Sequence, residues 1–107
     1  MPTLTLTQAD NNRSFDVQTG DTIVILLEES PTTGYRWAID QADQQILRLQ
    51  NSDFSLAAGG GVGGGGQRTF TFIAQKPGAT RVSLKLWRDW EGNNSITSRV
   101  DVAINVK

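Results

Sequence analysis

The C-terminal residues 100–107, with the sequence VDVAINVK, carry the clearest structural signal in the chain. Small or polar side chains alternate there with four apolar ones, at Val100, Val102, Ile104 and Val106. Because successive side chains of a β-strand point to opposite faces of a sheet, this alternation predicts a strand with one buried face and one face toward solvent.

Two segments upstream repeat the pattern. In residues 69–74 and 81–87 the even-numbered positions are apolar, and most positions between them are polar. Pro77 and Gly78 lie between the segments and indicate a turn, because proline presets φ and glycine tolerates a positive φ. We therefore expect two connected strands here.

The N-terminal half contains shorter segments of the same kind. A continuous apolar run at residues 23–27 predicts a central strand, and residues 35–40 alternate around Trp37 after a turn at residues 31–34. No stretch shows helical periodicity over several turns. Further short strands are expected at residues 4–6, 15–17 and 46–49, the last followed by Phe54 and Leu56.

Strands at intervals of ~8–12 residues, separated by turn signals, predict an all-β fold, an immunoglobulin-like antiparallel β-sandwich of seven or eight strands. A tryptophan on the third major strand, Trp37, fits the core position common in such folds. A partly open barrel has a similar sequence pattern and is the alternative. A chain of 107 residues can close one hydrophobic core, so we expect residues 1–107 to form a single domain.

The composition argues against several classes of partner. Hydrophobic residues make up 37% of the chain and charged residues 20%, which is typical of a globular domain. The formal net charge of -1 predicts no basic surface for nucleic acid or anionic lipid. No apolar run approaches the ~20 residues that cross a bilayer, and residues 1–4 lack the features of a signal peptide. We expect a cytoplasmic protein, or an exported or periplasmic one if a leader has been removed.

The chain has no cysteine and no histidine. These absences remove disulfides, the usual zinc ligands, the commonest general base and the Ser-His and Cys-His nucleophile pairs. The carboxylates do not cluster around a candidate site. We therefore expect neither an enzyme nor a bound metal or cofactor.

Three segments between the strands are candidates for function. The first is Ser-Pro-Thr-Thr-Gly-Tyr-Arg-Trp at residues 30–37, where turn chemistry explains the proline and glycine but not the pair Thr32 and Thr33 at the tip.

The second segment is the tract at residues 59–66, which holds seven of the chain's 11 glycines. It contains a formal G-x-G-x-x-G at Gly61, Gly63 and Gly66, but a dinucleotide site needs a strand before the motif and a helix after it, and here a strand follows. A flexible tether is one interpretation. The other is that bare backbone enters a narrow cleft, because no Cβ prevents close approach.

The third segment is Trp-Arg-Asp-Trp-Glu-Gly-Asn-Asn at residues 87–94. Trp90 beside Arg88 in a polar loop is typical of a binding anchor, although a tryptophan that folds back onto the core is the alternative. Trp87 falls on the outer face of its strand, where it can pack beside an arginine or lysine stem.

In this order and spacing, the three segments resemble the chagasin family of inhibitors of papain-like cysteine proteases. The family pattern is an Asn-Pro-Thr-Thr-Gly-Phe/Tyr loop, a Gly-rich loop and an Arg-Pro-Trp-x-Gly loop. This chain departs from it at Ser30, in place of Asn, and at Asp89, in place of Pro, which removes a conformational lock from the third loop.

The resemblance implies a sandwich that presents three adjacent loops at one end and blocks a protease cleft reversibly, with no catalytic residue of its own. It implies a papain-like cysteine protease as the partner, and we expect the inhibitor to be a monomer. The protease-binding residues implied by the resemblance are Pro31, Thr32, Thr33, Gly34, Tyr35, Gly61, Val62, Gly63, Gly64, Arg88 and Trp90.

Two other classes remain possible on the sequence. One is a carbohydrate- or peptide-binding β-sandwich module in which Trp87 and Trp90 form an aromatic platform, which requires both rings to be exposed on one surface. The other is a structural adhesion or assembly domain, supported only by analogy of fold.

Overall fold

The computed structural model describes residues 3–29, 34–56 and 66–107. These residues form eight strands and two short 3-10 helices, η1 (Gln8–Asp10) and η3 (Asp89–Ser95). The strands are β1 (Thr3–Thr7), β2 (Ser14–Val17), β3 (Thr22–Glu29), β4 (Arg36–Gln41), β5 (Leu47–Leu56), β6 (Gly66–Ala74), β7 (Gly78–Trp87) and β8 (Ser98–Val106). Within the described residues, no helix is long and apolar enough to cross a membrane.

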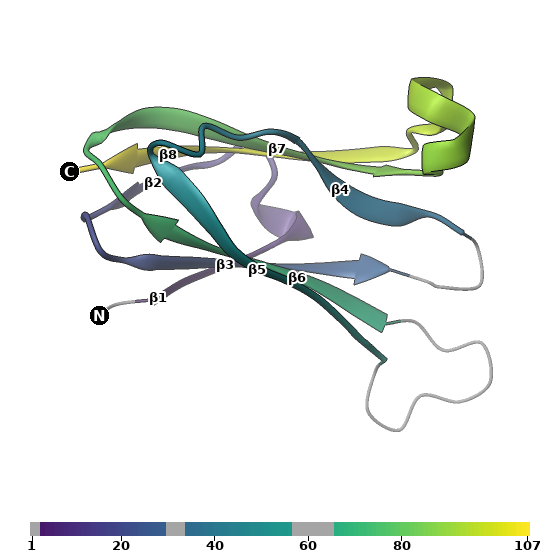
Figure 1. Cartoon of the computed structure of the whole chain (residues 1–107), viewed down its shortest axis with the longest axis horizontal. Coiled ribbons are helices and arrows are strands. Elements are labelled where there is room, and N and C mark those ends of the chain that lie inside the picture. Colours follow the sequence, from purple (N-terminus) through teal and green to yellow (C-terminus); the bar gives the residue numbers. More distant parts are fainter. Residues whose placement is uncertain (1–2, 30–33, 57–65) are drawn as a thin grey trace.

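The strands form two four-stranded sheets packed face to face, in the orders β1-β3-β6-β5 and β2-β8-β7-β4 (Figure 1). This arrangement confirms the predicted all-β sandwich of immunoglobulin-like type. Four of the strand pairings are antiparallel, whereas β1 pairs with β3 and β2 pairs with β8 in parallel. The chain reverses direction at each connection, so strands an even number of steps apart run the same way.

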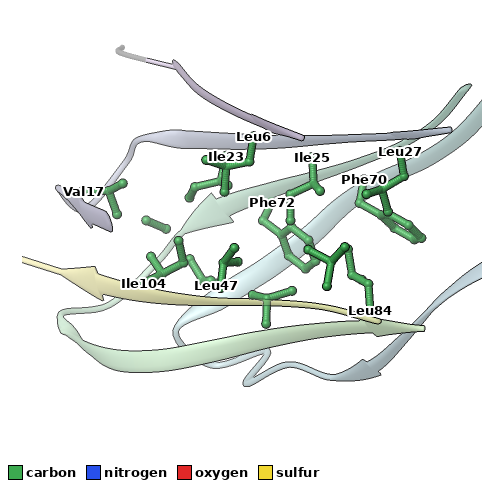
Figure 2. Close-up of a cluster of buried hydrophobic side chains, with 14 of the residues drawn as sticks. Leu6, Val17, Ile23, Ile25, Leu27, Leu47, Phe70, Phe72, Leu84 and Ile104 are labelled. Carbon is green, nitrogen blue, oxygen red and sulfur yellow. The ribbon is translucent and has the colours of Figure 1, made fainter. Parts of the chain in front are cut away.

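The hydrophobic core lies between the two sheets (Figure 2). The alternation predicted from the sequence is confirmed, because the apolar positions of β3, β6, β7 and β8 point inward and are buried. Across the first sheet Ile23 pairs with Phe72 and Ile25 with Phe70, which places these side chains on one face. Trp37 on β4 is 4% exposed and occupies the predicted core position.

Strand β5 differs from the prediction of one short strand at residues 46–49. It is a single ten-residue strand whose register against β6 shifts between Leu49 and Asn51. A bulge of one residue reverses which side chains face the core, so Leu47 and Leu49 share a face with Ser52 and Phe54. Because the alternation of inward and outward side chains changes phase at the bulge, a pattern of strict alternation does not extend over the whole strand.

The strand ends that flank the three candidate loops lie at one end of the sandwich, which we call the loop end (Figure 1). In the first sheet Gly66 pairs with both Glu29 and Leu56, the last residues of β3 and β5. In the second sheet Arg36 pairs with Trp87, directly before η3. The fold thus brings together the ends of three segments that are distant in the sequence.

Candidate functional site

Four of the eleven predicted site residues lie in the described part of the chain: Gly34, Tyr35, Arg88 and Trp90. They come from two different loops, and the structure brings them into contact at the loop end. We call these four residues the loop surface. The other predicted site residues lie outside the described residues; they are Pro31, Thr32, Thr33, Gly61, Val62, Gly63 and Gly64.

The first contact of the loop surface joins Gly34 to Trp90. Gly34 has φ +80, and a Cβ built on it would lie 2.7 Å from Cη2 and 3.3 Å from Cζ2 of Trp90. The indole ring therefore lies directly against the backbone of Gly34. Glycine meets two requirements here, because a side chain would be strained by the positive φ and would collide with the ring.

The second contact joins Arg88 to Tyr35. The Arg88 guanidinium carbon lies 4.4 Å from the centroid of the Tyr35 ring, which is cation–π geometry. Arg88 also forms an ion pair with Glu91, at 3.1 Å between Nη1 and Oε1. Arg88 thus connects the third loop to the residue that follows Gly34.

Trp90 is 68% exposed, the one large apolar side chain exposed among the described residues. The alternative in which Trp90 folds back onto the core is therefore wrong. A large apolar ring held in solvent at a loop tip is typical of a surface that becomes buried on binding. Its role as an anchor stays a prediction.

The backbone of the third loop is more ordered than the turn that its composition indicates. Residues 89–95 form 3-10 helix η3, interrupted at Gly92, where φ is 77 and ψ is -165. The interruption turns the chain back, so that Ser95 returns to Arg88. Short helical turns of this kind are not visible in a pattern of hydrophobic spacing, because they bury no apolar face of their own.

A buried ion pair underlies the loop surface and was not predicted. Glu29 is 4% exposed and accepts hydrogen bonds from Arg68 Nη2 at 2.7 Å and Arg68 Nε at 3.2 Å. The same carboxylate accepts a bond of 2.6 Å from the backbone N–H of Trp37. We call Glu29, Trp37 and Arg68 the stem cluster, because they join the end of β3 to the beginnings of β4 and β6.

Two further contacts complete the base of the loops. Trp37 Nε1 donates to the carbonyl oxygen of Glu28 at 2.8 Å, which is a second bond across the first loop. At the other stem, a Cβ on Gly66 would lie 2.3 Å from Cζ of Phe54, and the Arg68 guanidinium lies 5.1 Å from the centroid of that ring. The beginning of β6 therefore packs against an aromatic ring of β5.

Lys85 lies on the outer face of β7, is 8% exposed and contacts η3 through Asn93. Its Nζ lies 3.5 Å from the centroid of the Trp87 ring, 3.3 Å from Asp40 Oδ1 and 3.4 Å from Asn93 Oδ1. The predicted packing of Trp87 beside a cationic stem is confirmed. Trp87 is half-buried, so the described residues do not provide the platform of two exposed rings that the carbohydrate-binding alternative requires.

Asp40 forms ion pairs with two cationic side chains on the same face of the sheet. Arg99 Nη1 lies 2.7 Å from Asp40 Oδ2, and Lys85 Nζ lies 3.3 Å from Oδ1. The hydrogen bonds from Arg99 and then Lys85 hold the pKa of the Asp40 carboxyl below the ordinary value of an aspartate. This network connects β4, β7 and β8 through their side chains.

The described residues supply contacts rather than catalytic groups. A cavity of 190 Å³ beside the loop surface is lined by Gly34, Arg68, Trp87 and Asp89, among others. In residues 3–29, 34–56 and 66–107, no three carboxylates are grouped so that they could hold a metal ion. The fold and the site together define a class of protein, a β-sandwich that exposes aromatic and basic side chains on the loops at one end.

Comparison with known proteins identifies the family. Residues 16–104 match the model of the Chagasin family peptidase inhibitor I42, and the chain therefore belongs to this family of inhibitors, whose members are not enzymes. The chain is 29% identical to Amoebiasin-1 of Entamoeba histolytica over 105 residues, which cover 92% of this chain and 99% of the relative. The family predicted from the three segments is thus confirmed.

Two solved structures share the fold. The cysteine protease inhibitor EhICP2 of Entamoeba histolytica superposes with a TM-score of 0.91 at 23% identity, over 100% of this chain and 97% of that one. PbICP-C, solved in complex with falcipain-2, superposes with a TM-score of 0.70 at 14% identity, over 100% of both chains.

Proposed function

We propose that this peptidase inhibitor blocks the active-site cleft of papain-like cysteine proteases with three loops of its loop end. The observation that carries the proposal is the loop surface. Trp90 is 68% exposed yet held against Gly34, and Arg88 stacks on Tyr35. An aromatic anchor beside an arginine is the composition that concentrates binding energy in protein interfaces.

The proposed contact residues include those outside the described part of the chain. Thr32 and Thr33 would hydrogen-bond groups around the catalytic centre of the protease, and the glycines at 61, 63 and 64 would follow the cleft closely. Val62, the one apolar side chain amid these glycines, would enter a neighbouring apolar pocket. The related fold of a cysteine protease inhibitor, EhICP2, supports a cysteine protease as the partner.

Preorganisation explains how a small surface binds a protease. Association loses side-chain and loop entropy, and residues already fixed in the free protein lose less of it. The contacts of Gly34 with Trp90 and of Tyr35 with Arg88 fix two loops relative to each other before binding. The inhibitor forms no covalent bond in this mechanism, since it acts by excluding substrate and water from the cleft.

Titration of papain with the purified protein tests the proposal. We expect residual peptidase activity to fall to a plateau at an equimolar ratio and to recover on dilution. A papain variant whose catalytic Cys is replaced by Ala should bind with similar affinity, measured by calorimetry. Undiminished activity of several papain-like enzymes at micromolar inhibitor, or binding that requires the intact catalytic Cys, would contradict it.

A further inference from the structure

Ser95, which no predicted motif includes, lies at the centre of the third loop. It is 8% exposed, and its Oγ is 2.9 Å from the backbone nitrogen of Arg88, 2.9 Å from the Arg88 carbonyl oxygen and 2.7 Å from the Gly92 carbonyl oxygen. The hydroxyl accepts from the Arg88 N–H and has one proton to donate to either carbonyl. A single side chain thus connects both ends of η3 and its interruption at Gly92.

The backbone hydrogen bonds at the two ends of η3 are local. Glu91 N donates to Arg88 O at 3.0 Å and Ile96 N donates to Asn93 O at 3.3 Å, each within one turn. Isolated helical turns are unstable in water, because one hydrogen bond does not compensate for the dihedral angles that it fixes. The buried Ser95 hydroxyl adds a constraint between residues seven positions apart.

The contacts of Ser95 lead directly to the loop surface. Arg88, whose backbone N–H donates to Ser95, is the residue that stacks on Tyr35. Trp90 lies between Arg88 and Gly92, the two residues that Ser95 joins. A buried hydroxyl therefore lies where it can fix the backbone that carries both side chains.

We propose that Ser95 is a positioning residue of the inhibitor, which fixes Arg88 and Trp90 in the orientation that the protease meets and makes no contact with the protease. The proposal rests on the proposed function of the loop end. It implies that the loop needs a constraint at this point rather than a hydroxyl as such, so a constraint of different chemistry should replace Ser95.

Asp89 offers a position for such a replacement. It is the first residue of η3, where proline is favoured because its missing N–H has no partner within the helix. The preceding residue, Arg88, has φ -101 and ψ 111, the extended conformation that a following proline requires. Asp89→Pro therefore restricts the loop without disturbing its geometry.

The experiment compares wild type, Ser95→Ala, Asp89→Pro and the double variant, with Ser98→Ala as the control for loss of an exposed serine hydroxyl. Inhibition constants against papain are measured together with ¹⁵N order parameters of residues 89–95 in the free protein. We expect Ser95→Ala to lower these order parameters and to weaken inhibition about tenfold, since the half-buried N–H of Arg88 loses its acceptor. Asp89→Pro should restore most of both in the double variant, and Ser98→Ala should change neither.

Three results would overturn the proposal: unchanged inhibition by Ser95→Ala, unchanged order parameters in that variant, or a double variant with an ordered loop but no recovery of inhibition. The last result would mean that Ser95 touches the protease. If Ser95→Ala fails to fold, Ser95→Cys keeps the shape with a weaker hydrogen-bonding group, and the same criteria apply. If wild type inhibits no papain-like enzyme, the proposed function fails, while the order parameters still decide whether Ser95 orders the loop.

Discussion

The stem cluster and the loop surface lie at the same end of the molecule and have opposite properties. In the stem cluster, Glu29 and Trp37 are each 4% exposed and bond to each other at the base of the loops. In the loop surface, Trp90 is 68% exposed and contributes little to the core. Under the proposed function, the stem cluster supplies stability and the loop surface supplies binding, as two adjacent layers, so substitutions should separate one property from the other.

The largest expected effect is on the stem cluster. Glu29→Ala leaves the Arg68 guanidinium and the Trp37 N–H without their acceptor in a buried site, and removing one partner of such a pair costs about 3–5 kcal/mol. We expect a loss of that size in the free energy of unfolding, measured by chemical denaturation.

Asp16→Ala is the matched control, because Asp16 and Lys107 form an ion pair of 3.5 Å with side chains 66% and 63% exposed. Its cost should stay within about 1 kcal/mol. Equal losses in the two variants would show that the Glu29 pair is no more important to the fold than a surface pair.

Trp90→Ala tests the other layer. We expect binding to papain to weaken by about 1–3 kcal/mol, as for an aromatic anchor at an interface, because the variant loses the exposed ring. The melting temperature should stay at the wild-type value, since the ring is outside the core. A fall in melting temperature without a loss of affinity would assign Trp90 to the stability layer instead.

Gly34→Ala should affect both layers and so marks the boundary between them. Its φ of 80 costs an alanine about 1–2 kcal/mol of stability. The new Cβ should also displace Trp90 and weaken inhibition. Gly20→Ala, with φ 98 on the β2–β3 connection, also places an alanine at a positive φ, but at the end of the sandwich remote from Trp90. If Gly20→Ala weakens inhibition as much as Gly34→Ala does, the contact with Trp90 is not the cause.

The smallest effect concerns pH. The pKa of Asp40 is lower in the folded protein than in the unfolded chain, because Arg99 and Lys85 stabilise the carboxylate. Its contribution to stability is therefore present above the unfolded pKa and is lost as pH falls through the folded pKa. Asp40→Asn should lower the melting temperature at pH 7, and the difference from wild type should shrink toward pH 3. A difference in melting temperature that is constant with pH would show that the lowered pKa of Asp40 is not the cause of the stabilisation.

Much of the fold could be predicted because alternation reports burial directly. In β6 and β8 the buried positions are the even-numbered apolar residues from 70 to 74 and from 100 to 106. In β7 Val82 and Leu84 are buried as predicted, but the outward Ser83 and Lys85 are buried as well. Strand β5 was predicted in part, since its bulge at Gln50 changes the phase. β1 pairs in parallel with β3, and β2 pairs in parallel with β8. Both pairings depend on which sheet the strand joins, and alternation within a strand contains no information on that.

The stem cluster was missed although a signal was present. Glu29 continues the odd-numbered inward phase of Ile23, Ile25 and Leu27, and Arg68 stands in phase with Phe70. Two opposite charges in the buried phase of neighbouring strands indicate a pair, but they are 39 residues apart and meet only in the folded sheet. Ser95 gave no signal, because its function depends on the reversal of the chain at Gly92.

An even number of alternating strands places the beginning of β1 and the end of β8 together, at the end of the sandwich remote from the loops (Figure 1). The loop end therefore lies at one end of the molecule, and the beginning of β1 and the end of β8 lie at the other. A tag, a fluorophore or a second domain joined at either terminus would lie away from the loop end. Such a fusion can be fixed to a surface with the loops facing the solution, and two copies in tandem can each present their loops to a separate enzyme.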